Sequence, residues 1–143
     1  MPAQYGDGGE DVVIGYVTVG TNDLDRARAY YDGLFASIGG RRLMQLDDQR
    51  GFTMYGVAMN RPAVVLIEPY DGQAANPGNG NMVAIVMDSK DKVDAFHARA
   101  IELGGANEGD PGFRGDPSRG SYFAYFRDLD GNKFAVFNYA PQV

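Results

Sequence analysis

The chain has 143 residues, with 13 basic and 19 acidic side chains and a net charge of −6 at pH 7. Hydrophobic residues make up 44% and charged residues 22%, which is the composition of a globular domain and not of a disordered tail. The acidic balance argues against nucleic acid or a membrane as a partner, because anionic surfaces are bound through clustered Lys and Arg. The absence of Cys and the single His exclude disulfides, thiolate metal sites and any site with two imidazoles from one chain.

The first residues, 1–11, are polar and rich in Gly, and they predict a flexible N-terminal arm. They lack the basic region and the apolar stretch of a secretory signal. The chain also contains no run of 18 apolar residues, so we expect no membrane-spanning segment and a cytoplasmic location.

The first half of the chain opens with a β-branched, apolar run that predicts a strand over residues 12–19. A helix is predicted next, capped by Asn22 or Asp23 and ended by Gly39-Gly40. Its apolar residues recur at helical spacing: Leu24, Ala27, Tyr31, Leu34 and Ile38. Three further strands are expected over 41–46, 51–59 and 63–70.

The stretch 71–81 has no apolar periodicity and predicts a linker. The second half then repeats the pattern of the first, with a strand over 82–87 and a helix capped by Asp88 or Ser89 and ended by Gly104-Gly105. Its last three strands are expected around 106–108 and over 121–127 and 132–139.

Each half therefore has the order β-α-β-β-β, which indicates an internal duplication. We predict an α+β protein with two βαβββ modules, over residues 12–70 and 82–140. A sheet that carries one helix has one covered face and one bare face. Two such units have to bring their bare faces together, or curve around a shared cavity, to complete a core.

Segments 14–40, 82–105 and 122–137 resemble the vicinal oxygen chelate superfamily, which includes glyoxalase I, bleomycin-resistance proteins, fosfomycin-resistance enzymes and extradiol dioxygenases. The resemblance implies a curved mixed β-sheet around a central cavity, with the helices outside. In the enzymes of this family the cavity usually holds a divalent metal bound by His, Glu or Gln. The resemblance also implies a homodimer.

The positions where relatives carry metal ligands hold other residue types here. By the resemblance, a His commonly stands at the position of Tyr16, another at Met82, and a Glu at Ala135. A divalent cation needs three or more imidazole or carboxylate ligands, and Tyr, Met and Ala do not supply them. Glu68 is the fallback candidate near the remaining position. We therefore predict a degenerate metal site and no cofactor.

Aromatic residues concentrate in the predicted strands, where period-2 alternation sends about half of them to the face away from the helices. They are Phe52, Tyr55, Tyr122, Phe123, Tyr125, Phe126, Phe134 and Phe137. Packing in a sheet core explains such residues, but an aromatic concave face also suits a flat, mostly apolar ligand. The candidate ligand-binding residues are Tyr16, Met82, Ala135, Phe52, Tyr122 and Phe137.

The segment 109–122 is rich in Gly and Pro and carries Arg114 and Arg119. It is predicted to be a solvated connector; the alternative is a loop that closes over a ligand and pairs with a carboxylate or phosphate.

Two functions of different classes follow from these features. The first is metal-independent binding of a small, partly aromatic molecule in the central cavity, where the acidic net charge would suit a cationic ligand. The second is a glyoxalase-like lyase, isomerase or dioxygenase, metal-free or with displaced ligands. In that case Tyr16 or His97 would carry the acid–base chemistry. An isolated His on the flank of a helix more often has a structural role.

Overall fold

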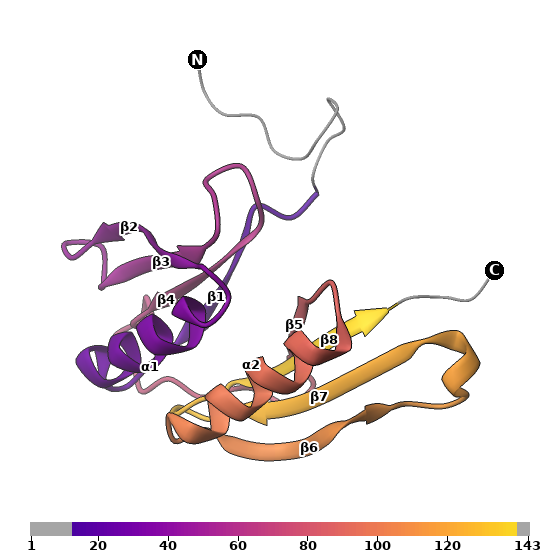
Figure 1. Cartoon of the computed structure of the whole chain (residues 1–143). Helices are drawn as coiled ribbons and strands as arrows, with labels where there is room; N and C mark the ends of the chain where they lie inside the picture. The colour runs from indigo at the N-terminus through magenta and orange to yellow at the C-terminus, as the bar shows by residue number, and fades with distance from the viewer. Residues whose placement is uncertain (1–12, 140–143) are drawn as a thin grey trace. The chain divides into compact units, whose positions relative to one another are not determined.

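The computed structural model describes residues 13–139 (Figure 1). The chain divides into two compact units, with the boundary between Asn76 and Pro77, inside the segment predicted as a linker. The predicted N-terminal arm, residues 1–11, lies outside the described residues.

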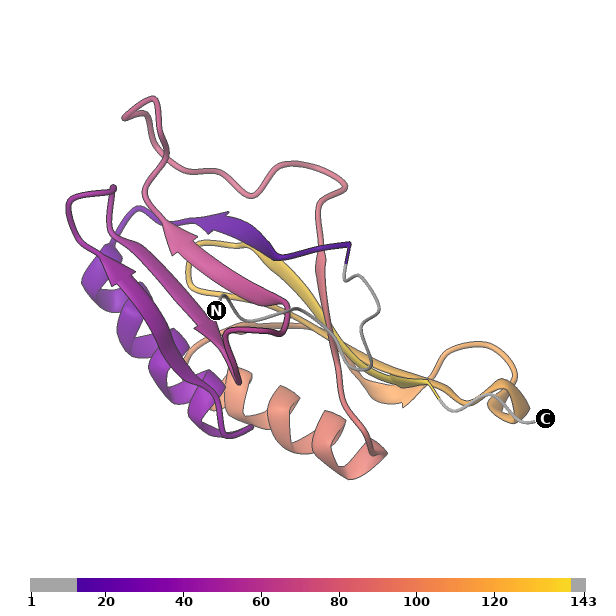
Figure 2. The ribbon, with the colours of Figure 1, turned by 90° about the horizontal axis from the view of Figure 1, so that it is seen from above.

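The first unit is a mixed four-stranded sheet with one helix along it. Its strand order is β1-β4-β3-β2, in which β1 is parallel to β4 and the other pairs are antiparallel. The elements are β1 (Tyr16–Gly20), α1 (Leu24–Ala36), β2 (Arg41–Leu46), β3 (Phe52–Gly56) and β4 (Ala63–Ile67). Figure 2 shows α1 running alongside the strands of this sheet.

The second unit repeats this topology, with the strand order β5-β8-β7-β6 and β5 parallel to β8. The elements are β5 (Val83–Val86), α2 (Lys90–Glu102), β6 (Ala106–Phe113), the short 3₁₀ helix η1 (Pro117–Arg119), β7 (Ser121–Arg127) and β8 (Lys133–Tyr139). The prediction of an α+β protein with two βαβββ modules is confirmed. No helix in residues 13–139 is long and apolar enough to cross a membrane.

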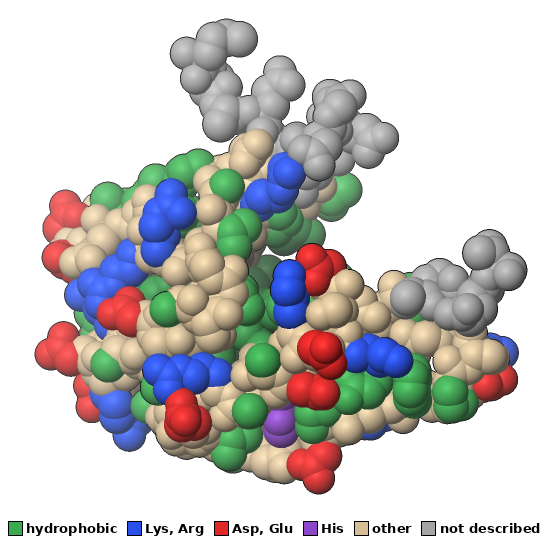
Figure 3. Space-filling view, viewed as in Figure 1, with side chains coloured by type: hydrophobic (Ala, Val, Ile, Leu, Met, Phe, Trp, Pro, Cys, Tyr) green, Lys and Arg blue, Asp and Glu red, His purple; other side chains and the backbone are tan. Residues whose placement is uncertain are grey.

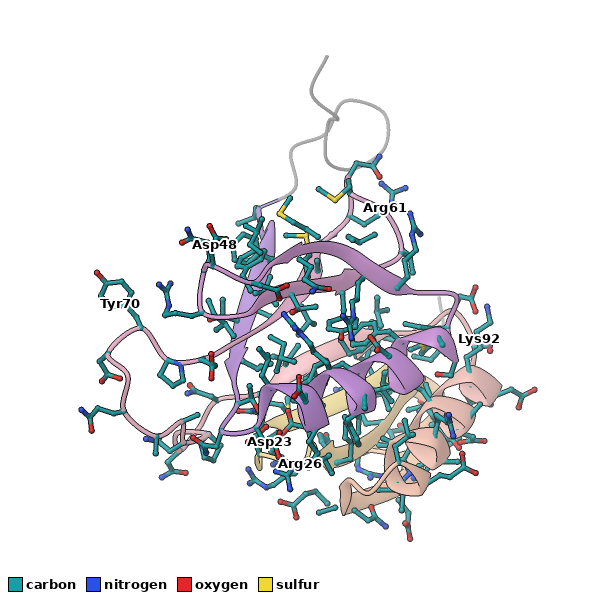
Figure 4. All side chains as sticks on the ribbon, turned by 90° about the vertical axis from the view of Figure 1, so that its left-hand side faces the viewer. Asp23, Arg26, Asp48, Arg61, Tyr70 and Lys92 are labelled. Carbon is teal, nitrogen blue, oxygen red and sulfur yellow. The ribbon has the colours of Figure 1, made fainter. Side chains whose placement is uncertain are left out.

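Both helices begin and end at the residue types that the sequence indicates. The Asp23 side chain accepts a hydrogen bond from the Arg26 N–H at 3.1 Å, where both lie at the start of α1 (Figure 4). Ser89 caps α2 in the same way. Gly39 and Gly104 follow the helices with positive φ angles of 75° and 109°, a backbone conformation that stops a helix and favours glycine. On the face shown in Figure 3, the Lys, Arg, Asp and Glu side chains are spread over the surface.

Strand β6 is longer than the sequence predicts. It extends through residues 109–113, which were expected to belong to a connector, and only the turn around η1 remains irregular. Register shifts between Asn107, Gly109 and Gly112 absorb the Gly- and Pro-rich sequence as bulges against β7. Because β6 is an edge strand, Pro111 can lie in it without removing a hydrogen bond from the interior of the sheet.

The helix-facing side of each sheet forms a core of aromatic rings. In the first unit Tyr55 of β3 packs against Tyr31 and Phe35 of α1, with ring centroids 5.5 Å apart in both pairs. In the second unit Phe126 of β7 stacks on Phe134 of β8 at 5.2 Å. These rings are buried, so each helix is held by apolar area as well as by its caps.

One polar network ties α1 to β2 and β3. The Tyr55 hydroxyl donates to Asp32 Oδ1 at 2.8 Å, and the Arg42 guanidinium donates to both Asp32 oxygens, each at 2.8 Å. Burial raises the pKa of Asp32, but the hydrogen bonds from Arg42 and Tyr55 outweigh it and hold that pKa below its usual value. Burial, together with the bond to Asp32, raises the pKa of Tyr55, which is therefore neutral and a hydrogen-bond donor. The network therefore joins α1 to β2 and β3, and its role is structural.

Candidate functional site

The face of the second sheet opposite α2 carries a row of aromatic rings, Phe123, Tyr125 and Phe137, which we call the aromatic row. Phe123 stacks on Phe137 across β7 and β8, with centroids 4.9 Å apart and planes 10° apart. Phe123 also stacks on Tyr125 along β7, at 6.0 Å and 15°. All three side chains are partly exposed, whereas the helix-facing neighbours Ala124 and Phe126 are fully buried. The row is therefore an ordered apolar surface that the helix leaves uncovered.

The glycines of β6 make room for this row. A Cβ on Gly109 would lie 2.9 Å from Cδ2 of the Tyr125 ring, closer than such atoms approach. The residue pairs with Tyr125 across the β6–β7 ladder. The Tyr125 ring therefore lies directly over Gly109, at a register shift in the β6–β7 ladder, and a larger residue there would displace the ring.

Strand β5 continues the same face with smaller, exposed side chains. In the ladder with β8, Ala84 is opposite Ala135 and Val86 is opposite Phe137. Val86 is 67% exposed, Met82 is 46% exposed and Ala84 is exposed, while Ala135 is fully buried. Ala84 and Val86, with the exposed Met82 just before the strand, form an apolar strip beside Phe137, which we call the β5 strip.

Two cations lie over the aromatic row. Lys133 Nζ is 5.5 Å from the centroid of the Tyr125 ring, and the Arg114 guanidinium carbon is 5.4 Å from it. Arg114 also donates to the carbonyl oxygen of Asp110. No carboxylate of the described residues forms an ion pair with Lys133. The local charge of this face is therefore positive, although the chain as a whole is acidic.

Tyr122 lies on the other side of the sheet from Phe137. Its hydroxyl donates to Asp94 Oδ1 of α2 at 2.6 Å, and this hydrogen bond raises the pKa of Tyr122. Alternation along β7 puts Tyr122 on the face of Ala124 and Phe126, which α2 covers. The candidate residues Tyr122 and Phe137 therefore do not line one surface.

In the first unit Tyr16 and Phe52 lie together on the face opposite α1. Their rings meet edge to face, with centroids 5.7 Å apart, and Tyr16 is 48% exposed. Phe52 packs against a buried cluster on that face made of Met54, Ala63 and Val65. This face is apolar, and Tyr16 supplies its hydroxyl at the edge.

The residues present do not fit the divalent metal that the fold family implies. On the face of Tyr16, the neighbouring strand β4 presents Ala63, Val65 and Ile67, none of which has a ligand atom. Among residues 13–139 no three His, Cys, Asp or Glu side chains gather at one point. Glu68 follows the end of β4, and its N–H donates to the carbonyl oxygen of Arg50 at 2.9 Å.

His97 of α2 is buried between the helix and its sheet. Its Nε2 lies 3.1 Å from Asn107 Oδ1 and 3.1 Å from the carbonyl oxygen of Tyr125. Both partners are acceptors, because Asn107 Oδ1 also accepts from the Gly109 N–H, so Nε2 carries a proton and donates to them. The ring edge packs on Phe126. His97 thus joins α2 to β6 and β7 and lies on the covered side of the sheet.

Replacing His97 with Leu, which is similar in volume, is expected to lower the free energy of unfolding by about 1–2 kcal/mol, because two buried acceptors lose their donor. Urea denaturation followed by circular dichroism measures this effect. A variant that unfolds like the wild type would contradict the structural role.

The sequence predicted only part of the surface formed by the aromatic row and the cations above it. Phe123 and Tyr125 share the face of Phe137, and Lys133 lies over it, but the sequence alone did not single out these three residues for binding. Alternation was the available signal, since Phe123 and Tyr125 flank Ala124, a small residue that suits contact with a helix. The expectation that about half of the strand aromatics face away from the helices is met by Phe52 and the aromatic row.

Comparison with known proteins agrees with this architecture. The family model of the Glyoxalase/Bleomycin resistance protein/Dioxygenase superfamily matches residues 13–136. No curated protein matches the chain. A glyoxalase/bleomycin resistance protein from Albidiferax ferrireducens T118 is 32% identical, with a TM-score of 0.75 over 89% of this chain and 98% of that one.

Two more distant structures share the fold. Glyoxalase I from Zea mays is 24% identical, with a TM-score of 0.67 over 87% of this chain and 43% of its own. A lactoylglutathione lyase from Agrobacterium tumefaciens is 22% identical, with a TM-score of 0.63 over 91% of this chain and 95% of that one. Because the family model spans most of the sequence, the chain belongs to the glyoxalase/bleomycin resistance protein/dioxygenase superfamily.

Proposed function

We propose that this protein binds a small, flat, partly aromatic molecule without the help of a metal, and that the ligand lies on the face formed by the aromatic row and the β5 strip. The observation that carries the proposal is the stacked pair Phe123–Phe137, whose planes are 10° apart. Parallel rings on an uncovered sheet face offer a preformed stacking surface at little cost in side-chain entropy.

The register suggests where the ligand ring would lie. Phe137 is stacked on Phe123 on the β7 side, and β5 lies on its other side. A ring placed on that second side would lie over Val86, which is exposed. The side chain of Ala84 is short and leaves space for the rest of a flat molecule.

The cations near Tyr125 favour an acidic ligand. Lys133 and Arg114 would attract a carboxylate or phenolate on the ligand, in contrast to the cationic ligand that the net charge suggested. The central cavity and the homodimer that the family resemblance implies stay predictions.

A test uses three probes of similar size: 2-naphthoate, the nonaromatic decalin-2-carboxylate, and the cationic 2-naphthylmethylamine. Isothermal titration is expected to give the tightest binding for 2-naphthoate. Phe137→Leu is expected to weaken that binding about tenfold, since stacking on one ring contributes about 1–3 kcal/mol. Phe113→Leu is the matched control, because Phe113 is also partly exposed in the second unit but lies against Tyr122 and outside the row.

The proposal fails if 2-naphthoate binds equally to the wild type and to Phe137→Leu, or if the decalin acid binds as well as the naphthoate. Conversion of the bound probe, detected by mass spectrometry, would instead support a lyase, isomerase or dioxygenase.

A further inference from the structure

The first unit contains a cleft that none of the candidate residues except Glu68 had indicated. It lies past the ends of β1 and β4, has a volume of about 460 Å³, and adjoins a second hollow of about 410 Å³. Both are lined by Arg50, Glu68, Pro69 and Tyr70, and the larger one also by Thr18 and Asp71. Tyr70, on the loop after β4, stands at the side of the unit (Figure 4).

Arg50 is held in this cleft in an unusual state. Its Nε is buried and has no hydrogen-bond partner. Its φ is +54°, the one positive value for a non-glycine residue among residues 13–139. A buried donor without a partner and a left-handed backbone at a β-substituted residue both cost free energy. The protein therefore leaves this donor unsatisfied, on a side chain that lines the cleft.

The hairpin geometry explains how Arg50 is kept there. Arg50 and Gly51 both have positive φ, and the Phe52 N–H donates to the carbonyl oxygen of Gln49 at 3.0 Å, which is a type I′ turn. The carbonyl oxygen of Arg50 accepts from the Glu68 N–H at 2.9 Å, which joins the turn to the end of β4. The guanidinium carbon lies 4.8 Å from the centroid of the Tyr70 ring. The side chain is therefore directed over the cleft.

The opposite wall is fixed by hydrogen bonds. Asn22 Oδ1 accepts from the Ala75 N–H at 2.7 Å, and Asn22 Nδ2 donates to the carbonyl oxygen of Ala75 at 3.0 Å. A Cβ on Gly20 would lie 3.0 Å from the Ala75 methyl group, so β1 and the 71–76 segment are in close contact. The first part of the predicted linker is thus a wall of the first unit, and the cleft is preformed.

The cleft presents both signs of charge without pairing them. Glu68 and Asp71 line it together with Arg50, but neither carboxylate forms an ion pair with that guanidinium. Two carboxylates would repel a phosphate dianion, and one guanidinium would repel a divalent cation. A ligand that carries one acidic and one basic group can pair with both the guanidinium of Arg50 and the carboxylates of Glu68 and Asp71.

We propose that this cleft binds a small amino-acid-like zwitterion. Its carboxylate accepts hydrogen bonds from the Arg50 guanidinium, and its ammonium group lies beside Glu68 and Asp71. Tyr70 and Ile67 give its side chain apolar contact. The site is in the first unit and is independent of the aromatic row, so either binding activity can fail without the other.

The test is ligand-detected NMR and isothermal titration with the twenty standard L-amino acids, each at up to roughly 10 mM, a range that detects weak binding. At least one is expected to bind. Its analogue without the amino group and its analogue without the carboxylate are both expected to bind about tenfold more weakly. No binding by any of the twenty overturns the proposal.

The decisive variant is Arg50→Asn, because Asn tolerates positive φ and keeps the turn while it removes the guanidinium. It is expected to bind the amino acid at least about tenfold more weakly and to melt no lower than the wild type. Arg41→Asn, which removes an exposed arginine outside the cleft, is the control and is expected to bind normally. Equal affinity of the wild type and Arg50→Asn overturns the proposal.

Glu68→Gln tests whether Glu68 contacts the ammonium group of the ligand. It is expected to weaken binding of the amino acid about tenfold but to leave binding of the analogue without the amino group unchanged. If both ligands lose affinity equally, Glu68 does not face the ammonium group and the zwitterion proposal is wrong.

Discussion

Replacing Phe126 with Ala is expected to lower the free energy of unfolding by about 3–5 kcal/mol, the usual cost of deleting a buried aromatic ring. Phe126 is fully buried, stacks on Phe134 and meets Phe96 of α2, with centroids 6.0 Å apart in the latter pair. It therefore joins β7, β8 and the helix at one point. The loss is a large part of the total stability of a small domain.

Urea denaturation followed by far-ultraviolet circular dichroism measures this loss. Phe113→Ala removes the same ring from a position that is 39% exposed, and its effect is expected to stay below about 1 kcal/mol. Equal losses for the two variants would mean that the helix-facing core does not hold the second unit together.

Replacing Gly51 with Ala is expected to destabilise the first unit by about 2–4 kcal/mol. The residue has a φ of +72°, which costs about 1–2 kcal/mol for a residue with a Cβ. The new Cβ would also lie 2.3 Å from Leu24 Cδ2, so the Leu24 side chain has to shift out of its present packing. Both the β2–β3 turn and the contact of that turn with the helix are disturbed.

Gly39→Ala separates the cost of the positive φ from the cost of the collision with Leu24. Gly39 has nearly the same φ, +75°, but a Cβ there meets no atom within 4 Å. Its loss is expected to be about 1–2 kcal/mol, the conformational part alone. The difference between the two variants in thermal or urea denaturation then measures the collision with Leu24. If Gly39→Ala costs as much as Gly51→Ala, the packing part of the prediction is wrong.

Much of the fold could be read from the sequence because it depends on local patterns. The apolar spacing of each helix, its Asp or Ser cap and its glycine stop are local, and both helices have the predicted caps. The repetition of these signals in the two halves then indicated two βαβββ modules.

The candidate site was predicted less completely, because a surface depends on which strands are neighbours. Alternation alone does not say which face a helix covers, and Tyr122 was assigned to the face of Phe137 although it bonds to Asp94 of α2. The β6 edge was also missed, because bulges let a Gly- and Pro-rich sequence continue a ladder.

The sequence by itself determined the two modules and the ends of their helices, because spacing and capping depend on local residue type. It also predicted that Tyr16, Met82 and Ala135 supply no imidazole or carboxylate ligand, because that depends on residue type alone. Only the tertiary structure decided that Phe123, Tyr125 and Phe137 form one stacked row, since two of these rings come from β7 and the third from β8. It alone also decided the surroundings of Arg50. Its buried, unpartnered Nε results from a turn that packs beside segments far away in the chain, and no local pattern encodes that neighbourhood.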